Sequence, residues 1–277
     1  MERKPATWRN ALTLGAALLA AVGAARAGPG DVVSSFTIPG LSNNGPRGLA
    51  YNATDELYAA ADNRGYKQVR IFKFTYDGGA ANVVASFNCP VAVMWAMDIT
   101  WRPGRIYVAN DIPEGGGTPK IVVLDDATGS FTNNFNSPFG ANVHVNGLTW
   151  DGEYLYASSY DSPRVYRLTT GGSVAASFVA DHAANNGLAF DGARLWLVAG
   201  RVNYDARRYT TDGNRQLGFG FDVNDEYVGG ACWGRPDLHT LFVSTYTGGR
   251  YVFELSTDVN TPSVAPASFG KIKALFR

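Results

Sequence analysis

Two stretches of sequence decide the fold: residues 147–156, which read GLTWDGEYLY, and residues 187–196, which read GLAFDGARLW. Each opens with glycine, an aliphatic residue, a small residue and an aromatic residue. Each closes with a second apolar segment. Short apolar segments of this kind, rich in aromatic residues and separated by turn residues, predict β-strands.

The opening of this unit occurs five times, and successive openings lie 50, 49, 40 and 43 residues apart. They begin at Gly48 (GLAY), Asp98 (DITW), Gly147 (GLTW), Gly187 (GLAF) and Gly230 (GACW). A second apolar triplet follows each opening, at residues 57–59, 106–108, 155–157, 195–197 and 241–243. A repeat of this length is the mark of a repeat architecture.

Two further segments complete the unit. The third lies at residues 69–74, 121–125, 165–168, 207–210 and 251–255, and the fourth at 83–87, 131–135, 174–178 and 215–219. Turn residues such as Gly171-Gly172 separate the two. Four strands in a unit of about 40 to 50 residues predict one blade of a β-propeller.

The fifth unit lacks its fourth strand, and the missing strand lies at the other end of the chain. Residues 32–36 (VVSSF) match residues 83–87 (VVASF) and 174–178 (VAASF). The sequence therefore predicts an all-β, five-bladed β-propeller closed by pairing the N-terminal strand with the last blade. Such closure removes two free sheet edges.

The first strand of each unit is expected to line the central axis. Glycine suits a position where five sheets crowd together and little side chain fits. The recurring aromatic residues are predicted to pack between blades rather than to contact a ligand. They are Tyr51, Trp101, Trp150, Phe190 and Trp233.

The N-terminus has the pattern of a secretory signal peptide over residues 1–27. Basic residues precede an apolar run at 11–25, which ends in Ala25-Arg26-Ala27, a small-x-small cleavage pattern. We expect the mature chain to begin at Gly28, with the propeller over residues 28–259. The protein would then be periplasmic, extracellular or on the cell surface.

Residues 260–277 are predicted to form a linker and a short C-terminal tail. The linker at 261–267 is rich in Pro, Ser and Ala, and the tail reads SFGKIKALFR. It resembles the short basic-aromatic endings of other exported bacterial repeat proteins, which implies a sorting or attachment segment. The alternative is a short helix that packs on the propeller.

The charge balance bears on the class of partner, and the cysteine content bears on disulfide bonding. After removal of residues 1–27 the chain has 20 basic and 23 acidic residues, a net charge of −3. Nothing in this balance favours nucleic acid as a partner, and no transmembrane segment is predicted in the mature chain. Cys89 and Cys232 are 143 positions apart, and both are predicted to be unpaired.

The repeat resembles those of secreted bacterial propellers of the glutamine-cyclotransferase-like, NHL and YVTN types, over residues 32–255. The five-bladed glutaminyl cyclases of this group carry a glutamate directly before the Gly-Leu of an inner strand. The residues at the five corresponding positions here are Arg47, Met97, Asn146, Asn186 and Gly229. The resemblance therefore implies the fold. Since none of these five residues is the glutamate that the cyclases carry, no catalytic residue is predicted.

A binding site is expected on the loop face, which we define as the end of the ring formed by the loops that enter the first strands and the loops that join second to third strands. Four of the latter loops carry a tyrosine, which suits a glycan or peptide surface. The alternative is that each tyrosine packs between blades. The candidate ligand-binding residues are Tyr66, Trp95, Asp98, Asn146, Tyr160, Asn186, Tyr204 and Tyr246.

No cofactor or metal is predicted. Asp98, Asn146 and Asn186 together make only a weak calcium site, because they carry one charge. His144 and His182 lie in consecutive loops of the loop face, but no third ligand is placed beside them.

These features predict a non-enzymatic binding module for an extracellular glycan, peptide or protein. One alternative is a propeller enzyme, a hydrolase, lyase or cyclotransferase that uses Asp62, Asp98, Asp111 or Asp161 at the channel mouth. Another is a structural subunit of a surface assembly.

Overall fold

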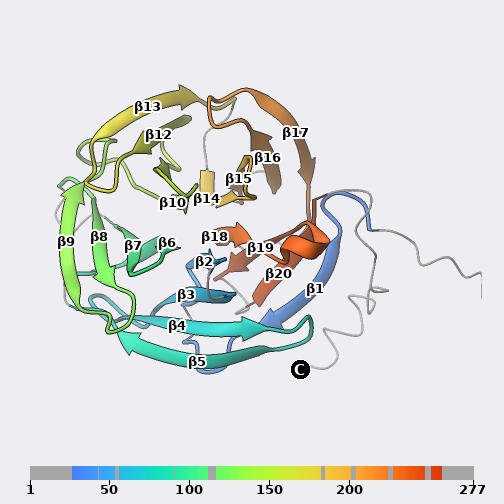
Figure 1. Ribbon diagram of the computed structural model, residues 1–277, viewed down its shortest axis with the longest axis horizontal. Helices are drawn as coiled ribbons and strands as arrows, with labels where there is room; N and C mark the ends of the chain where they lie inside the picture. Colours follow the sequence, from blue (N-terminus) through green and yellow to red (C-terminus); the bar gives the residue numbers. More distant parts are fainter. Residues whose placement is uncertain are drawn as a thin grey trace, which may run out of the picture.

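Five four-stranded antiparallel sheets are arranged in a ring around a central axis (Figure 1). The structure, a computed structural model, describes residues 27–257 apart from 43, 54–55, 91, 112–116, 182–184, 201–203, 224–226 and 247–250. The predicted five-bladed β-propeller is confirmed. The proposed C-terminal tail and the proposed signal peptide, apart from its last residue Ala27, lie outside the described residues.

Each blade runs from an inner strand at the axis to an outer strand at the rim. The inner strands are β2 (Gly48–Asn52), β6 (Ala96–Arg102), β10 (Gly147–Trp150), β14 (Asn185–Phe190) and β18 (Val228–Trp233). The second strands are β3 (Leu57–Asn63), β7 (Arg105–Asn110), β11 (Leu155–Ser158), β15 (Leu195–Ala199) and β19 (Thr240–Thr245). The third strands are β4 (Val69–Tyr76), β8 (Lys120–Asp125), β12 (Arg164–Leu168), β16 (Asp205–Tyr209) and β20 (Tyr251–Ser256). The outer strands are β5 (Ala81–Asn88), β9 (Phe131–Asn136), β13 (Val174–Val179), β17 (Arg215–Gly220) and β1 (Val32–Thr37).

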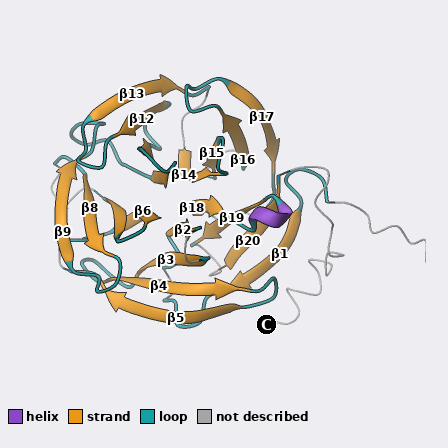
Figure 2. Cartoon of the chain, viewed as in Figure 1, coloured by secondary structure: helices purple, strands orange, loops and turns teal. Residues whose placement is uncertain are grey.

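Helix is nearly absent from the described part of the chain. One 3₁₀ turn, η1 (Pro236–Leu238), lies between β18 and β19 (Figure 2). No helix among the described residues has the length and apolar character needed to cross a membrane.

The N-terminal strand closes the ring, as predicted. β1 pairs with β20 in antiparallel fashion, with Val32 opposite Leu255 and Thr37 opposite Tyr251. Its apolar side chains face inward: Phe36 stacks on Tyr76 and meets Phe242 edge to face. The two ends of the propeller are therefore joined through a packed sheet.

A buried carboxylate reinforces this closure. Glu254 of β20 is fully buried and accepts hydrogen bonds from Ser34 of β1 (2.7 Å), Thr240 (3.0 Å) and Arg235 (Oε1 to Nε, 2.7 Å). Pairing and hydrogen bonding compensate the cost of burying the charge. Since one of these donors comes from β1, the network joins the first strand to the last.

The axis is packed so closely that glycine is required there. A Cβ on Gly48 would lie 2.6 Å from Cα of Asp98, and one on Gly187 would lie 2.6 Å from N of Ala231. These distances are shorter than real Cβ contacts. The repeat glycines are therefore explained by the close approach of neighbouring inner strands, as the sequence predicted.

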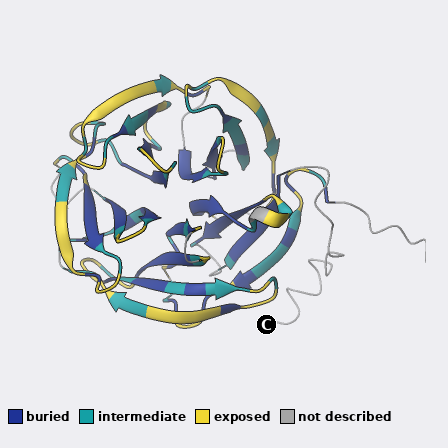
Figure 3. Ribbon diagram, in the orientation of Figure 1, coloured by how far each residue is buried: buried dark blue, intermediate teal, exposed yellow. Residues whose placement is uncertain are grey.

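Burial falls from the axis to the rim, where the outer strands expose much of their surface (Figure 3). The outer-strand phenylalanine of one blade packs beneath the turn between third and fourth strands of the next. A Cβ on Gly172 would lie 2.3 Å from Phe135, and Gly172 itself has φ of 89°. The recurring Ser-Phe ending of the fourth segment thus marks a contact between blades.

Both cysteines are free, as predicted. Cys232 lies in the buried inner strand β18, and Cys89 follows β5. Burial raises the pKa of the Cys89 thiol to about 12. Neither thiol is placed to act as a nucleophile, because the thiolate is disfavoured at neutral pH.

Candidate functional site

The loop face is formed where the second strand of each blade ends and the inner strand begins. Antiparallel pairing fixes this geometry, since Gly48 at the start of β2 lies opposite Ala61 near the end of β3. The residues that lead directly into the axial position are Arg47, Met97, Asn146, Asn186 and Gly229.

A column of planar groups lies at the mouth of this face. The guanidinium of Arg47 lies 3.4 Å from the ring centroid of Tyr246 and 5.4 Å from that of Trp95. The ring of Tyr227 stacks on Tyr246, with centroids 6.0 Å apart and planes inclined by 19°. The column joins the first, second and fifth blades. Two predicted site residues, Trp95 and Tyr246, are brought together in it.

Arg47 is the cation of this column. Burial lowers the pKa of Arg47, while the neighbouring Tyr246 and Asp111 act in the opposite direction. Its Nε is buried and has no hydrogen-bond partner among the described residues. The guanidinium stays charged and stacks on the ring of Tyr246.

An Asp–His pair lies beside Arg47, and the sequence did not predict it. Nδ1 of His144 lies 2.6 Å from Oδ1 of Asp111, and the two side chains are 40% and 22% exposed. The backbone N–H of His144 donates to Asp161 at 2.9 Å. The partners are 33 positions apart in loops of different blades, so no local motif could reveal the pair.

Asp98, predicted to be a ligand-binding residue, does not lie on the surface of the loop face. Its carboxylate is fully buried on the axis and accepts backbone N–H groups of Leu49 (3.3 Å), Ile99 (2.9 Å) and Leu148 (2.9 Å). It occupies the position that glycine holds in the other four repeats, so its side chain fills the space that they leave. The carboxylate closes the channel below the loop face.

The two predicted asparagines organise the loops. Asn146 and Asn186 are both buried. Asn146 accepts the backbone N–H of Tyr160 at 2.9 Å, and Asn186 donates to the carbonyl of Val228 at 3.0 Å. The Oδ1 of Asn186 has no hydrogen-bond partner among the described residues.

The four predicted tyrosines have different surroundings. Tyr66 is 41% exposed, and its hydroxyl lies 3.3 Å from the sulfur of Met94. Tyr160 is half-buried. Tyr204 packs against the core of the fourth and fifth blades and meets Phe221 edge to face. Tyr204 is thus partly buried against the core, and Tyr246 belongs to the column.

The acids named for an enzyme are largely engaged. Asp62 is fully buried and accepts both Ser42 and Arg64. In the described part of the chain, no group of three or more His, Cys, Asp or Glu residues is arranged to hold a metal ion. The single acid of the weak calcium set, Asp98, is fully buried, and its oxygens already accept backbone N–H groups. His182 lies outside the described residues.

No protein-family model matches this sequence, and no curated protein sequence matches it either. Solved structures do match. The chain is similar in fold to the glutaminyl cyclase of Myxococcus xanthus. The two share 11% identity with a TM-score of 0.62, over 83% of this chain and 96% of that one. This agrees with the resemblance drawn from the repeat, and at this identity it concerns the fold.

Two other solved structures match with lower TM-scores. One is a putative 6-phosphogluconolactonase from Bacteroides uniformis, with a TM-score of 0.46 and 16% identity over 72% of this chain and 64% of that one. The other is a catalytically inactive virginiamycin B lyase from Staphylococcus aureus with quinupristin, with a TM-score of 0.48 and 15% identity over 77% of this chain and 66% of that one.

Proposed function

We propose that this chain is an exported binding propeller whose loop face holds a glycan that carries carboxylate groups. The observation that carries the proposal is the column of Arg47 with Trp95, Tyr246 and Tyr227 at the channel mouth. A guanidinium recognises a carboxylate through charge-assisted hydrogen bonds. Aromatic side chains beside it offer large contact area at low entropic cost.

Binding is favoured over catalysis by the state of the acidic residues. Asp98 and Asp62 are buried with their oxygens engaged in structural hydrogen bonds. A carboxylate held in this way stabilises the fold and has no access to a bound molecule. Arg47, the cation of the column, is the group that suits recognition of an acidic ligand.

The proposal is tested by measuring binding of oligogalacturonate, a chain of uronic acids, to the purified chain. We expect saturable binding that weakens with salt, because exposed charge pairs are screened. The methyl-esterified oligomer should bind at least ten times more weakly, because it keeps the sugar rings and loses the charge. Arg47→Gln should remove most of this preference.

Lys120→Gln is the matched control. Lys120 is an exposed cation at the start of β8, at the same end of the ring and outside the column. The Lys120→Gln variant should bind oligogalacturonate as the unmodified chain does. Equal binding of the acid and its ester, or an Arg47→Gln variant with unchanged preference, would contradict the proposal. Binding restricted to acidic peptides would replace the glycan with a peptide ligand.

A second candidate function rests on the His144–Asp111 pair. A histidine oriented by a carboxylate at 2.6 Å is an arrangement suited to proton transfer. An enzyme of this kind would turn over a ligand that it also binds. Incubating oligogalacturonate with the chain and with His144→Asn, followed by mass analysis, tests this. Cleavage by the unmodified chain but not by the variant would favour the enzyme. An oligomer that stays intact with both would favour the binding module.

A further inference from the structure

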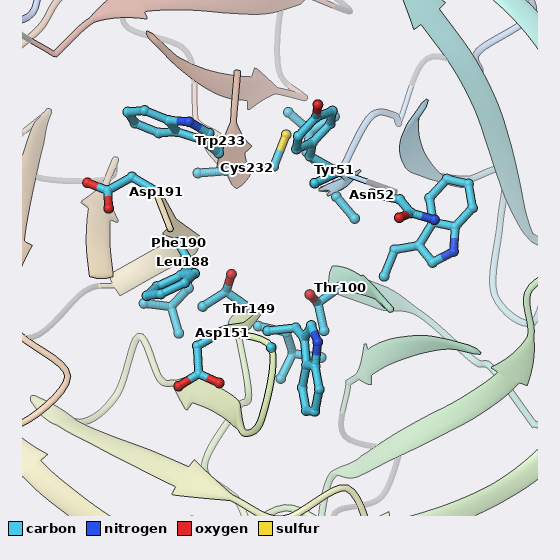
Figure 4. A pocket seen from close by; sticks show the side chains of 18 of the residues that line it. Tyr51, Asn52, Thr100, Thr149, Asp151, Leu188, Phe190, Asp191, Cys232 and Trp233 are labelled. Carbon is cyan, nitrogen blue, oxygen red and sulfur yellow. The ribbon is translucent and has the colours of Figure 1, made fainter. Parts of the chain in front are cut away.

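A cavity of about 440 Å³ lies at the other end of the channel. We call this end the turn face, because it is formed by the turns that follow the inner strands. All five blades contribute an aromatic side chain to the cavity, at the same position of the repeat (Figure 4). They are Tyr51, Trp101, Trp150, Phe190 and Trp233, which the sequence analysis assigned to packing between blades.

The cavity is separate from the loop face. Its floor is lined by Leu49, Leu148, Leu188 and Ala231, the residues that directly follow the axial position in four inner strands. The Asp98 carboxylate fills the axis beyond this floor and is fully buried. A ligand in the cavity therefore does not reach the column at the loop face.

The charges around the cavity favour a cation. Among the described residues that line it there is no Lys, Arg or His, and two are acidic, Asp151 and Asp191. Each of these acids lies at the margin of the cavity (Figure 4) and already accepts hydrogen bonds within its own turn, as Asp191 does from Ala193 and Arg194. They supply negative potential rather than direct contacts.

The aromatic rings differ in how far the protein's own cations occupy them. Lys73 stacks on Trp101 at 4.3 Å and Arg102 on Trp150 at 5.7 Å, and neither cation lines the cavity. In the described part of the chain no Lys or Arg stacks on Phe190 or Trp233, and the neighbours of the Trp233 ring are Trp196 and His239. These two rings lie beside Asp191 (Figure 4).

We infer that the cavity binds a small quaternary ammonium compound, with its cationic head against Phe190 and Trp233. Aromatic rings hold such cations through the negative faces of their π systems. The volume lies in the range of small-molecule sites, which begins at about 300 Å³. The hydroxyls of Thr100 and Thr149 project toward the middle of the cavity (Figure 4) and suit a ligand with a polar tail.

Choline and its uncharged isostere 3,3-dimethyl-1-butanol provide the test. Titration calorimetry and tryptophan fluorescence should show that the purified chain binds choline about ten times more tightly than the isostere, as expected for a desolvated cation–π contact. Glucose should not compete. Equal binding of choline and the isostere, no choline binding, or displacement by glucose would overturn the inference.

Two variants locate the site. Asp191→Asn should weaken choline binding several-fold and leave the isostere unchanged, because it removes charge. Phe190→Leu should weaken choline binding to a similar extent while keeping apolar volume, which guards against a variant that fails to fold. Asp77→Asn is the matched control: Asp77 accepts Gly79 and Ala80 in a similar turn at the same end and does not line the cavity. A loss of choline binding in Asp77→Asn, or none in both site variants, would contradict the assignment.

Discussion

Deleting β1 (Val32–Thr37) should abolish the cooperative unfolding transition of the whole propeller. The deletion removes the pairing with β20, uncovers Phe242 by removing Phe36, and takes Ser34 away from the buried Glu254. The inward-facing Val33 and Phe36 each contribute roughly 1.5–3 kcal/mol by burial, and each ladder hydrogen bond about 1 kcal/mol. Together these are comparable with the entire stability of a typical domain, about 5–15 kcal/mol. Circular dichroism during thermal unfolding measures the effect.

A pair of point variants makes the same test without shortening the chain. Phe36→Ala should lower the free energy of unfolding by about 3–5 kcal/mol, since Phe36 is 5% exposed. Val84→Ala in β5, an outer strand with the same motif, should cost less than about 0.5 kcal/mol, since Val84 is 56% exposed. An unchanged, cooperative transition after the β1 deletion would show that the ring does not depend on this closure.

Asp98→Ala should also destabilise the chain strongly. The variant leaves the N–H groups of Leu49, Ile99 and Leu148 without their acceptor on a buried axis. Each such orphaned group costs about 1–3 kcal/mol, so a loss of at least about 3 kcal/mol is expected at pH 4. Urea unfolding gives the value, and a midpoint equal to that of the unmodified chain would refute the structural role.

The effect of pH on this variant has a definite sign. Burial raises the pKa of Asp98 well above its ordinary value of 3.8. The native state therefore keeps a proton that the unfolded state releases, and this contribution to stability is lost as the pH rises from about 4. The stability difference between the unmodified chain and Asp98→Ala should shrink over that rise. Asp161→Ala, an exposed loop-face acid, should change stability little at any pH.

Blade number and ring closure could be predicted because they depend on features that repeat along the chain. The glycine of the inner strand recurs where backbones approach closely, as at Gly48 and Gly187. The match between residues 32–36 and 83–87 identified the strand that the last blade lacked. Repetition averages over local exceptions, so five imperfect copies specify the architecture better than one.

The binding surfaces were harder to predict because they depend on departures from the repeat. Asp98 stands where a glycine is expected, and its short side chain was placed at the channel mouth, whereas the surrounding N–H groups hold it on the axis. The contact between Arg47 and Tyr246 joins residues almost 200 positions apart. Side-chain pairs of this kind follow from the closed ring and leave no local pattern.

The turn-face cavity was not predicted from the sequence for a different reason. The sequence predicts that the recurring aromatic residue of each inner strand packs between blades. The structure does bury Trp101 and Trp233 there. The same five side chains also converge at one end of the channel, because each inner strand ends there. One repeated position can serve both the core and a cavity, and only the radial arrangement of the blades reveals the second.

If an acidic glycan binds at the loop face as proposed, its position should depend on the Arg47 column. Hydrogen–deuterium exchange with and without oligogalacturonate tests it most directly, because backbone protection reports the position of the ligand. We expect protection of residues 44–48, 92–97 and 227–229, with no change in the turns at 102–105, 151–154 and 191–194. Protection confined to those turns, or protection that persists in Arg47→Gln, would contradict it.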